Sequence, residues 1–151
     1  LQLNKFPTHV EVEDIALSDT AGTHSFFSRN DAMSSLVRSG LGTNADSPDI
    51  REEVVTTMRL DEYLKTKELG SPDWVKIDTE GAEINILRGA REMLQSGAKI
   101  VCELHPYAWE EFGTSYEELL TIVRDCGRQI SYLDESVKIE DGAVHGAVII
   151  S

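Results

Sequence analysis

The chain has 151 residues, enough for one domain that buries roughly 68–70% of its unfolded surface. Its 14 basic and 27 acidic residues give a net charge of −13, and no apolar run approaches the ~20 residues that span a bilayer. This charge repels phosphate backbones and anionic lipid, so neither nucleic acid nor a membrane is expected as a partner. The two cysteines, Cys102 and Cys126, are too few for a disulfide framework, which predicts free thiols and a cytoplasmic location.

The first third of the chain carries strand and turn signals. Residues 9–17 alternate apolar and polar side chains, which predicts a half-buried strand, and residues 23–27 predict a second strand after a turn at 18–22. Residues 30–49 are rich in Gly, Ser, Asn and Asp and predict a long loop with one helical turn near 32–37. A loop of this length is typical of a lid, a binding loop or disorder.

Strands and helices alternate in the rest of the chain. Further strands are predicted at 53–60, 74–77, 99–104, 129–133 and 143–150. The alternation predicts an α/β fold with a mostly parallel sheet and an antiparallel last strand.

Three helices are predicted between these strands. Asp61 is expected to cap the first, at residues 62–68. Residues 82–95 place their apolar side chains on one face and predict a single amphipathic helix. Thr114 with Glu117 forms a capping-box pattern that begins the third helix.

Ionisable side chains collect where two of the predicted strands end. Lys76, Asp78 and Glu80 follow one another at a spacing of two, and Glu103 and His105 repeat that spacing on the next strand. If these strands are parallel neighbours in register, Lys76 lies beside Glu103 as a structural ion pair and Asp78 lies beside His105. Open α/β sheets bind ligands outside the carboxyl ends of their strands, so these residues predict the site.

The types of these side chains indicate proton transfer. A histidine beside a carboxylate can take a proton from a hydroxyl near neutral pH, because the carboxylate stabilises the imidazolium that forms. Glu80 is open to two interpretations, a functional role or capping of the following helix. Asp78, Glu80 and His105 also resemble a metal-ligand set, and we favour a metal-free site. The other histidines show no partner pattern and are expected on the surface or in loops: His9, His24 and His145.

Residues 74–90, WVKIDTEGAEINILRGA, resemble the signature of the FkbM methyltransferase family, which reads KID-x-EG-x-E-x-x-x-L-x-G. Three more stretches resemble family pieces in the same order: ALSDTAG at 16–22, MRLDEY at 58–63 and VCELHP at 101–106. The resemblance spans residues 16–106, and the order of elements stays compatible to residue 151.

The resemblance implies a Rossmann-like class I methyltransferase fold in a single domain, residues 1–151, with S-adenosyl-L-methionine as the methyl donor. It implies a hydroxyl of a small molecule or glycan as the acceptor. Asp78 would lie near the transferred methyl group, and Ala16 and Leu17 near the adenine. Methyl transfer needs alignment and removal of the hydroxyl proton, so we expect His105, assisted by Asp78, to act as the base and Glu80 to orient the acceptor.

The chain departs from the family pattern in one respect. The family begins with a strand carrying a D-x-G-x-x-x-G turn and a second strand that ends in an acidic residue for the ribose, and neither occurs in these 151 residues. The GLG at 40–42 lies in a predicted loop rather than between a strand and a helix. We therefore expect a methyltransferase domain truncated at its N-terminus. A non-catalytic truncated methyltransferase fold that serves as an interaction module is the alternative function.

We expect the 151-residue chain alone to bind S-adenosylmethionine weakly or not at all. The glycine turn and the ribose carboxylate, which normally hold the donor in this family, are not among its residues. Isothermal titration calorimetry measures this affinity directly. Micromolar binding, which corresponds to about −8 kcal/mol, would contradict the expectation.

Overall fold

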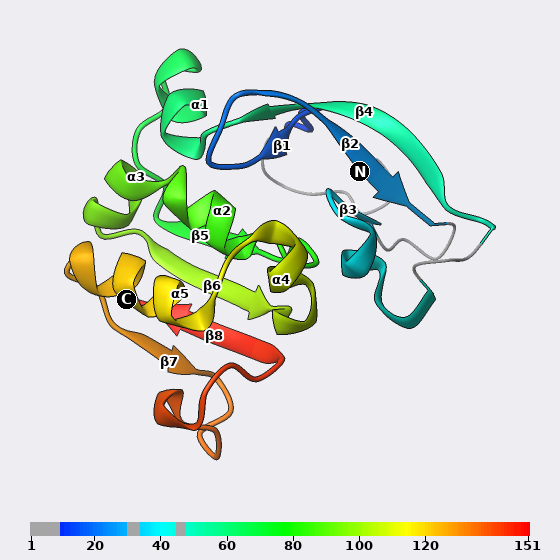
Figure 1. Cartoon of the computed structure of the whole chain (residues 1–151). Coiled ribbons are helices and arrows are strands. Elements are labelled where there is room, and N and C mark those ends of the chain that lie inside the picture. The colour runs from blue at the N-terminus through cyan, green and yellow to red at the C-terminus, as the bar shows by residue number, and fades with distance from the viewer. Residues whose placement is uncertain (1–9, 30–33, 45–47) are drawn as a thin grey trace.

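Two four-stranded sheets and the helices packed against them form the framework of the protein (Figure 1). The computed structural model describes residues 10–29, 34–44 and 48–151. The first sheet has the order β1-β4-β2-β3 and the second has the order β5-β6-β8-β7. The strands are β1 (Ala16–Leu17), β2 (Gly22–Ser28), β3 (Ser34–Ser35), β4 (Arg51–Met58), β5 (Trp74–Ile77), β6 (Lys99–Leu104), β7 (Ile130–Tyr132) and β8 (Gly146–Ile150).

The helices are short, and most of them follow β4 in the chain. The α-helices are α1 (Leu60–Thr66), α2 (Glu83–Arg88), α3 (Arg91–Gln95), α4 (Trp109–Phe112) and α5 (Tyr116–Asp125). The 3-10 helices are η2 (Arg38–Asn44), η3 (Pro106–Ala108) and η4 (Ile139–Asp141). No helix in the described ranges combines the length and apolar character needed to cross a bilayer.

The α/β fold class is confirmed, but the expectation of a mostly parallel sheet is wrong. Among the described residues, β1 with β4 and β5 with β6 are the parallel pairs, and the other pairs in both sheets are antiparallel. The parallel β5–β6 pair, joined through α2 and α3, is the part of the expected Rossmann-like sheet seen here. The predicted antiparallel last strand is present as β8, which inserts between β6 and β7. Antiparallel pairing follows because no α-helix separates β7 from β8, so the chain turns back on itself.

The hydrophobic core lies between the second sheet and its helices. Along β6, the side chains of Ile100, Cys102 and Leu104 are fully buried, and the residues between them are more exposed. This alternation places one face of β6 in the core, where α2 packs on the strand and against α5 (Figure 1). The other face carries Glu103 and remains open to polar chemistry.

The N-terminal part of the chain, up to the end of η2, differs in part from its prediction. The strand expected at 9–17 is confined to β1, and residue 9 lies outside the described residues. The strand expected at 23–27 is confirmed as β2. The helical turn expected near 32–37 is not found at the described residues 34–37, where β3 forms instead, and residues 32–33 lie outside the description. The helical segment comes later in the chain, as η2.

The helix predicted at 82–95 is broken into α2 and α3 at Gly89. A Cβ atom on Gly89 would lie 2.2 Å from the carbonyl oxygen of Ser18, so only glycine allows this close approach. The carbonyl of Gly89 accepts a hydrogen bond from the backbone N–H of Asp61. This bond replaces the one within the helix, so the α-helical hydrogen-bond pattern stops at Gly89. The predicted apolar face still holds, since all of its members are buried in the core: Ile86, Leu87, Ala90, Met93 and Leu94.

Asp61 does not cap its own helix as predicted, because α1 already begins at Leu60. Its buried carboxylate instead accepts hydrogen bonds from the backbone N–H groups of Glu92 (2.9 Å) and Met93 (3.0 Å), at the start of α3. A carboxylate satisfies free N–H groups in a first helical turn in the same way whether or not it belongs to that helix. Asp61 therefore joins α1 to α3.

Asp61→Ala is expected to lower the free energy of unfolding by about 1–2 kcal/mol, because two backbone N–H groups of α3 lose their acceptor. Chemical denaturation measures the loss, and Glu62→Ala, at the exposed neighbouring position of α1, is the control. Equal stability of the two variants would show that Asp61 does not hold α3.

Candidate active site at the ends of β5 and β6

A tight turn carries the chain from β5 into α2. Glu80 has a φ of 49° and Gly81 a φ of 110°, both in the left-handed region. A Cβ atom on Gly81 would lie 2.5 Å from the Cβ of Ala108 and 2.9 Å from the ring of Phe112, so glycine is required here for space as well as conformation. The turn therefore packs tightly against η3 and α4, which follow β6.

A buried carboxylate holds this turn against the end of β6. Glu83, the first residue of α2, is fully buried. Its Oε1 accepts hydrogen bonds from the backbone N–H of Gly81 and from Nδ1 of His105, both at 2.8 Å. Its Oε2 accepts a hydrogen bond from Nε1 of Trp109 at 2.9 Å. Three donors thus meet one carboxylate, which is how a protein keeps a buried charge from being destabilising.

The bond to Glu83 fixes the state of the His105 ring. His105 is 3% exposed and uses Nδ1 as the donor, so the neutral ring has its lone pair on Nε2. This Nε2 atom lies 3.5 Å from Oε2 of Glu80. Burial lowers the pKa of His105 and is the largest single influence on it, but the hydrogen bond to Glu83 and the charges of nearby glutamates together raise the pKa above its ordinary value.

The structure brings the three predicted catalytic residues together. One ligand atom each from Asp78, Glu80 and His105 lies within 4.8 Å of the others. The carboxylate of Glu80 also accepts a hydrogen bond from the hydroxyl of Tyr107 at 2.5 Å. Burial and the bond to Glu80 raise the pKa of the Tyr107 hydroxyl, which keeps it a hydrogen-bond donor at neutral pH.

The predicted strand register is wrong by two residues. Lys76 pairs with Val101 in the ladder rather than lying beside Glu103. Its ammonium group forms an ion pair at 2.6 Å with Asp78, the residue that directly follows β5. Asp78 and His105 still meet, because β6 extends beyond β5 and the turn after β5 folds back toward its end.

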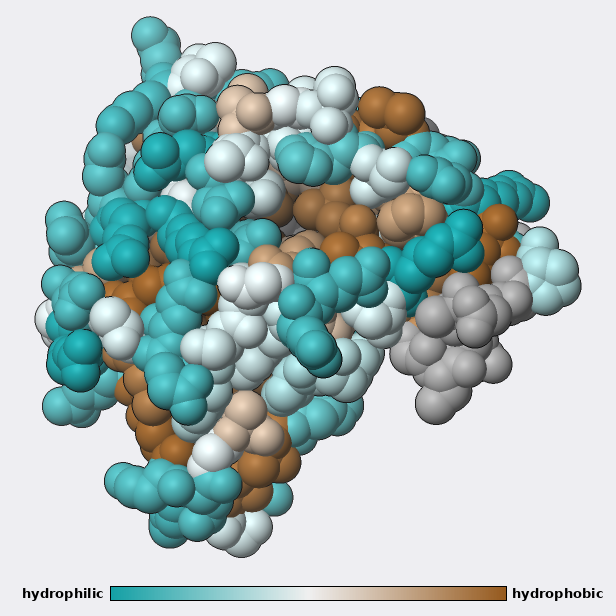
Figure 2. Space-filling view, viewed as in Figure 1, coloured by the Kyte–Doolittle hydropathy of each residue, from teal (hydrophilic) through white to brown (hydrophobic). Residues whose placement is uncertain are grey.

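The predicted cofactor-binding residues line one hollow beside this cluster. Ala16, Leu17 and Asp78 all border it, and its volume is about 390 Å³. Ile77, Ala82 and Ile86 add an apolar wall, and Figure 2 shows apolar side chains gathered on the surface between the first sheet and the layer of β5 and α2. The hydroxyl of Thr79, at the same wall, is buried and has no hydrogen-bond partner among the described residues. An apolar hollow with a few polar groups in its wall is typical of a small-molecule site.

The long loop docks onto the turn that carries Glu80. The hydroxyl of Ser35 donates a hydrogen bond to the backbone carbonyl of Glu80 at 2.9 Å. Gly40 packs so closely here that a Cβ atom would lie 2.4 Å from the same carbonyl oxygen. The backbone N–H of Ser39 donates to the carboxylate of Glu111 in α4. The predicted loop thus borders the hollow and supports the conformation of Glu80.

Sequence reasoning missed two residues of this site. Glu83 lies inside the quoted signature, at the second glutamate of EGAE, and that position was its only signal. Tyr107 had no signal, since its contact with Glu80 depends on how η3 folds. A second hollow of about 580 Å³ lies beside β7 and η4 and contains none of these residues, so we place the site at the smaller one.

Ionisable side chains at parallel strand ends beside an apolar hollow are the arrangement in which α/β proteins bind small molecules. The family model described as Methyltransferase FkbM domain matches residues 3–130, so the chain belongs to the FkbM methyltransferase family. Searches of curated proteins and of solved structures found no match.

Glu83→Gln is expected to destabilise the protein by about 1–3 kcal/mol. The amide is the same size as the carboxylate, but its NH₂ group must face at least one of the three N–H donors. The pKa of His105 should also fall, because a negative charge that raises it is removed. Chemical denaturation gives the stability, and NMR titration of the ring gives the pKa.

Glu110→Gln is the matched control, because it neutralises an exposed carboxylate of neighbouring α4. Unchanged stability and an unchanged His105 pKa in Glu83→Gln would show that the buried carboxylate does not organise the site.

Proposed function

We propose that the protein transfers a methyl group from S-adenosylmethionine to a hydroxyl of a small molecule or sugar. The observation that carries the proposal is the position of Asp78. It borders the hollow lined by Ala16 and Leu17, and it also belongs to the cluster that contains the Nε2 lone pair of His105. Membership of the FkbM methyltransferase family supports the same reaction class.

The hollow suits the adenosyl part of the donor. Ala16 and Leu17 would contact the adenine, the free hydroxyl of Thr79 offers a hydrogen-bond partner, and Asp78 would lie nearest the sulfur end. S-adenosylmethionine, when bound, supplies a methyl group on a positively charged sulfur. The methyl carbon would accept a lone pair of the acceptor oxygen while its bond to sulfur breaks, which leaves a neutral thioether. Asp78, which also pairs with Lys76, carries a negative charge that can stabilise that positive charge.

The acceptor hydroxyl must lose its proton as its oxygen becomes methylated. His105 is placed to take that proton, since its Nε2 carries the lone pair and Glu83 stabilises the imidazolium that results. The proton moves from the acceptor oxygen to Nε2, and the imidazolium then returns it to solvent. Glu80, held by Tyr107, orients the acceptor hydroxyl through its second carboxylate oxygen.

His105→Ala is expected to lower kcat by about 10²–10⁴-fold, the usual contribution of a general base. Affinity for S-adenosylmethionine should change little, because the ring faces the acceptor. Asp78→Ala should reduce both kcat and the affinity for S-adenosylmethionine, because Asp78 borders the donor as well as the acceptor. Transfer of a labelled methyl group to a panel of sugars and small hydroxylated molecules, in the complete protein, measures kcat, and calorimetry measures donor affinity.

Two controls accompany this experiment. His24→Ala removes an exposed histidine of β2, and thermal unfolding of each variant confirms that it folds. Full activity of His105→Ala would refute the role of His105 as the general base. Activity that is lost in chelator and restored by magnesium would favour a metal held by Asp78, Glu80 and His105. Donor binding without transfer to any acceptor would favour the non-catalytic interaction module.

A further inference from the structure

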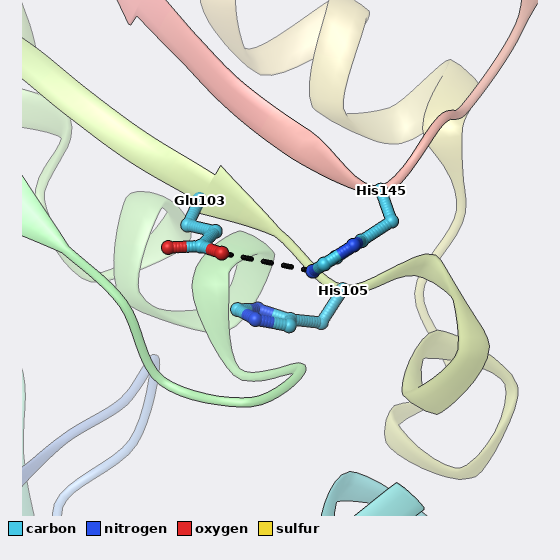
Figure 3. A group of neighbouring side chains, drawn as sticks. All are labelled: Glu103, His105 and His145. Atoms are coloured by element: carbon cyan, nitrogen blue, oxygen red, sulfur yellow. Dashed lines mark ion pairs between the residues drawn. The ribbon is translucent and has the colours of Figure 1, made fainter.

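His145, which was expected on the surface or in a loop, lies beside His105. In the antiparallel ladder of β6 and β8, Glu103 pairs with Ala147 and Leu104 with Gly146. His105 follows Leu104 and His145 precedes Gly146, so the two histidines lie side by side just beyond the ladder, with ring centroids 5.1 Å apart (Figure 3). The β6–β8 register therefore brings together two imidazoles that are 40 positions apart in the sequence.

A carboxylate completes a group of three around these rings. Nε2 of His145 lies 3.6 Å from Oε1 of Glu103, and one ligand atom from each of Glu103, His105 and His145 lies within 4.8 Å of the others (Figure 3). Two ligands bound to one tetrahedral zinc ion at about 2.0–2.2 Å lie about 3.4 Å apart. A closure of about 1–1.5 Å by the two more exposed side chains would therefore bring all three within reach of one ion.

The three side chains differ in exposure, and this difference suits a metal site. The His105 ring is buried, and its Nδ1 donates to the fully buried Glu83 carboxylate, which aims Nε2 away from the core. This carboxylate–histidine pair is the arrangement that orients a metal-ligating histidine. Side chains of His145 and Glu103 are 58% and 39% exposed, so they can adjust and the ion can enter from solvent.

We infer that Glu103, His105 and His145 form a binding site for a divalent metal ion of the zinc class. Two imidazoles and one carboxylate favour Zn²⁺, Co²⁺, Ni²⁺ or Cu²⁺ over Mg²⁺ and Ca²⁺, which prefer oxygen ligands alone. Asp78, Glu80 and Glu83 add negative charge close to His105, which attracts a cation to this edge of the sheet.

The other possible ligand group, Asp78 with Glu80 and His105, is less suited to such an ion. It contains a single imidazole, and both of its carboxylates already have partners. Asp78 pairs with Lys76 at 2.6 Å, and Glu80 accepts the hydroxyl of Tyr107 at 2.5 Å. In the group with His145, the ion would replace two longer contacts, that of His145 with Glu103 at 3.6 Å and that of Nε2 of His105 with Glu80 at 3.5 Å.

A bound ion would regulate the reaction proposed above. The lone pair on Nε2 of His105 can hold a proton or a metal ion but not both, so the ion would inhibit methyl transfer by occupying the base. This regulatory consequence rests on the proposed function, whereas the binding site does not.

Binding is tested with Zn²⁺ by calorimetry and with Co²⁺ by its visible absorption, in the folded protein. We expect one ion per chain. His145→Ala and Glu103→Gln should each weaken binding by more than about 10-fold, the loss seen when even an outer partner of a metal ligand is removed. His24→Ala, the matched histidine control, should bind the ion as the unaltered protein does.

Three results would overturn the site: no binding, binding unchanged in His145→Ala, or binding weakened by Glu80→Gln but not by Glu103→Gln. The inhibition test compares, within each variant, methyl transfer with and without Zn²⁺. Inhibition that chelator reverses, and that His145→Ala abolishes, supports the regulatory role. Metal binding that depends on His145 but leaves methyl transfer unaffected would keep the site and refute His105 as the base.

Discussion

The site depends on the hydrogen bonds that the buried carboxylate of Glu83 accepts. It is fully buried and accepts hydrogen bonds from Gly81, His105 and Trp109, which belong to the turn after β5, the end of β6 and α4. A buried carboxylate costs several kcal/mol of solvation, and three donors offset that cost only when all of them are in place. The three segments are therefore held in one arrangement, and the Nε2 atom of His105 with them.

The same arrangement keeps Glu80 in a conformation that is unfavourable for a residue with a side chain. Its φ of 49° lies in the left-handed region, which persists only where the surroundings determine it. The hydroxyl of Ser35 binds its carbonyl, and Tyr107 binds its carboxylate. Strain at a residue that borders the reacting groups is typical of a functional position. The long loop thus contributes to the site by fixing Glu80.

Four acidic side chains gather around His105. Asp78, Glu80, Glu83 and Glu103 surround His105, and Lys76 balances one of them. Burial lowers the pKa of the imidazole, but the hydrogen bond to Glu83 and the field of the Glu83, Glu80 and Glu103 carboxylates together raise it above its ordinary value. The same field favours any cation at this edge of the sheet, whether it is a proton, the sulfonium of a methyl donor or a metal ion.

The sequence by itself determined what depends on near neighbours in the chain. Strands at 74–77 and 99–104 and the apolar face of residues 82–95 follow from local periodicity, and the signature indicates Asp78 and Glu80 as site residues. The tertiary structure decided what depends on partners distant in the sequence. Asp61 caps a helix some 30 residues away, Gly89 breaks a helix because Ser18 passes over it, and β8 brings His145 to His105. Such contacts are set by strand order and register, and a shift of register moves every side chain, which local patterns do not encode.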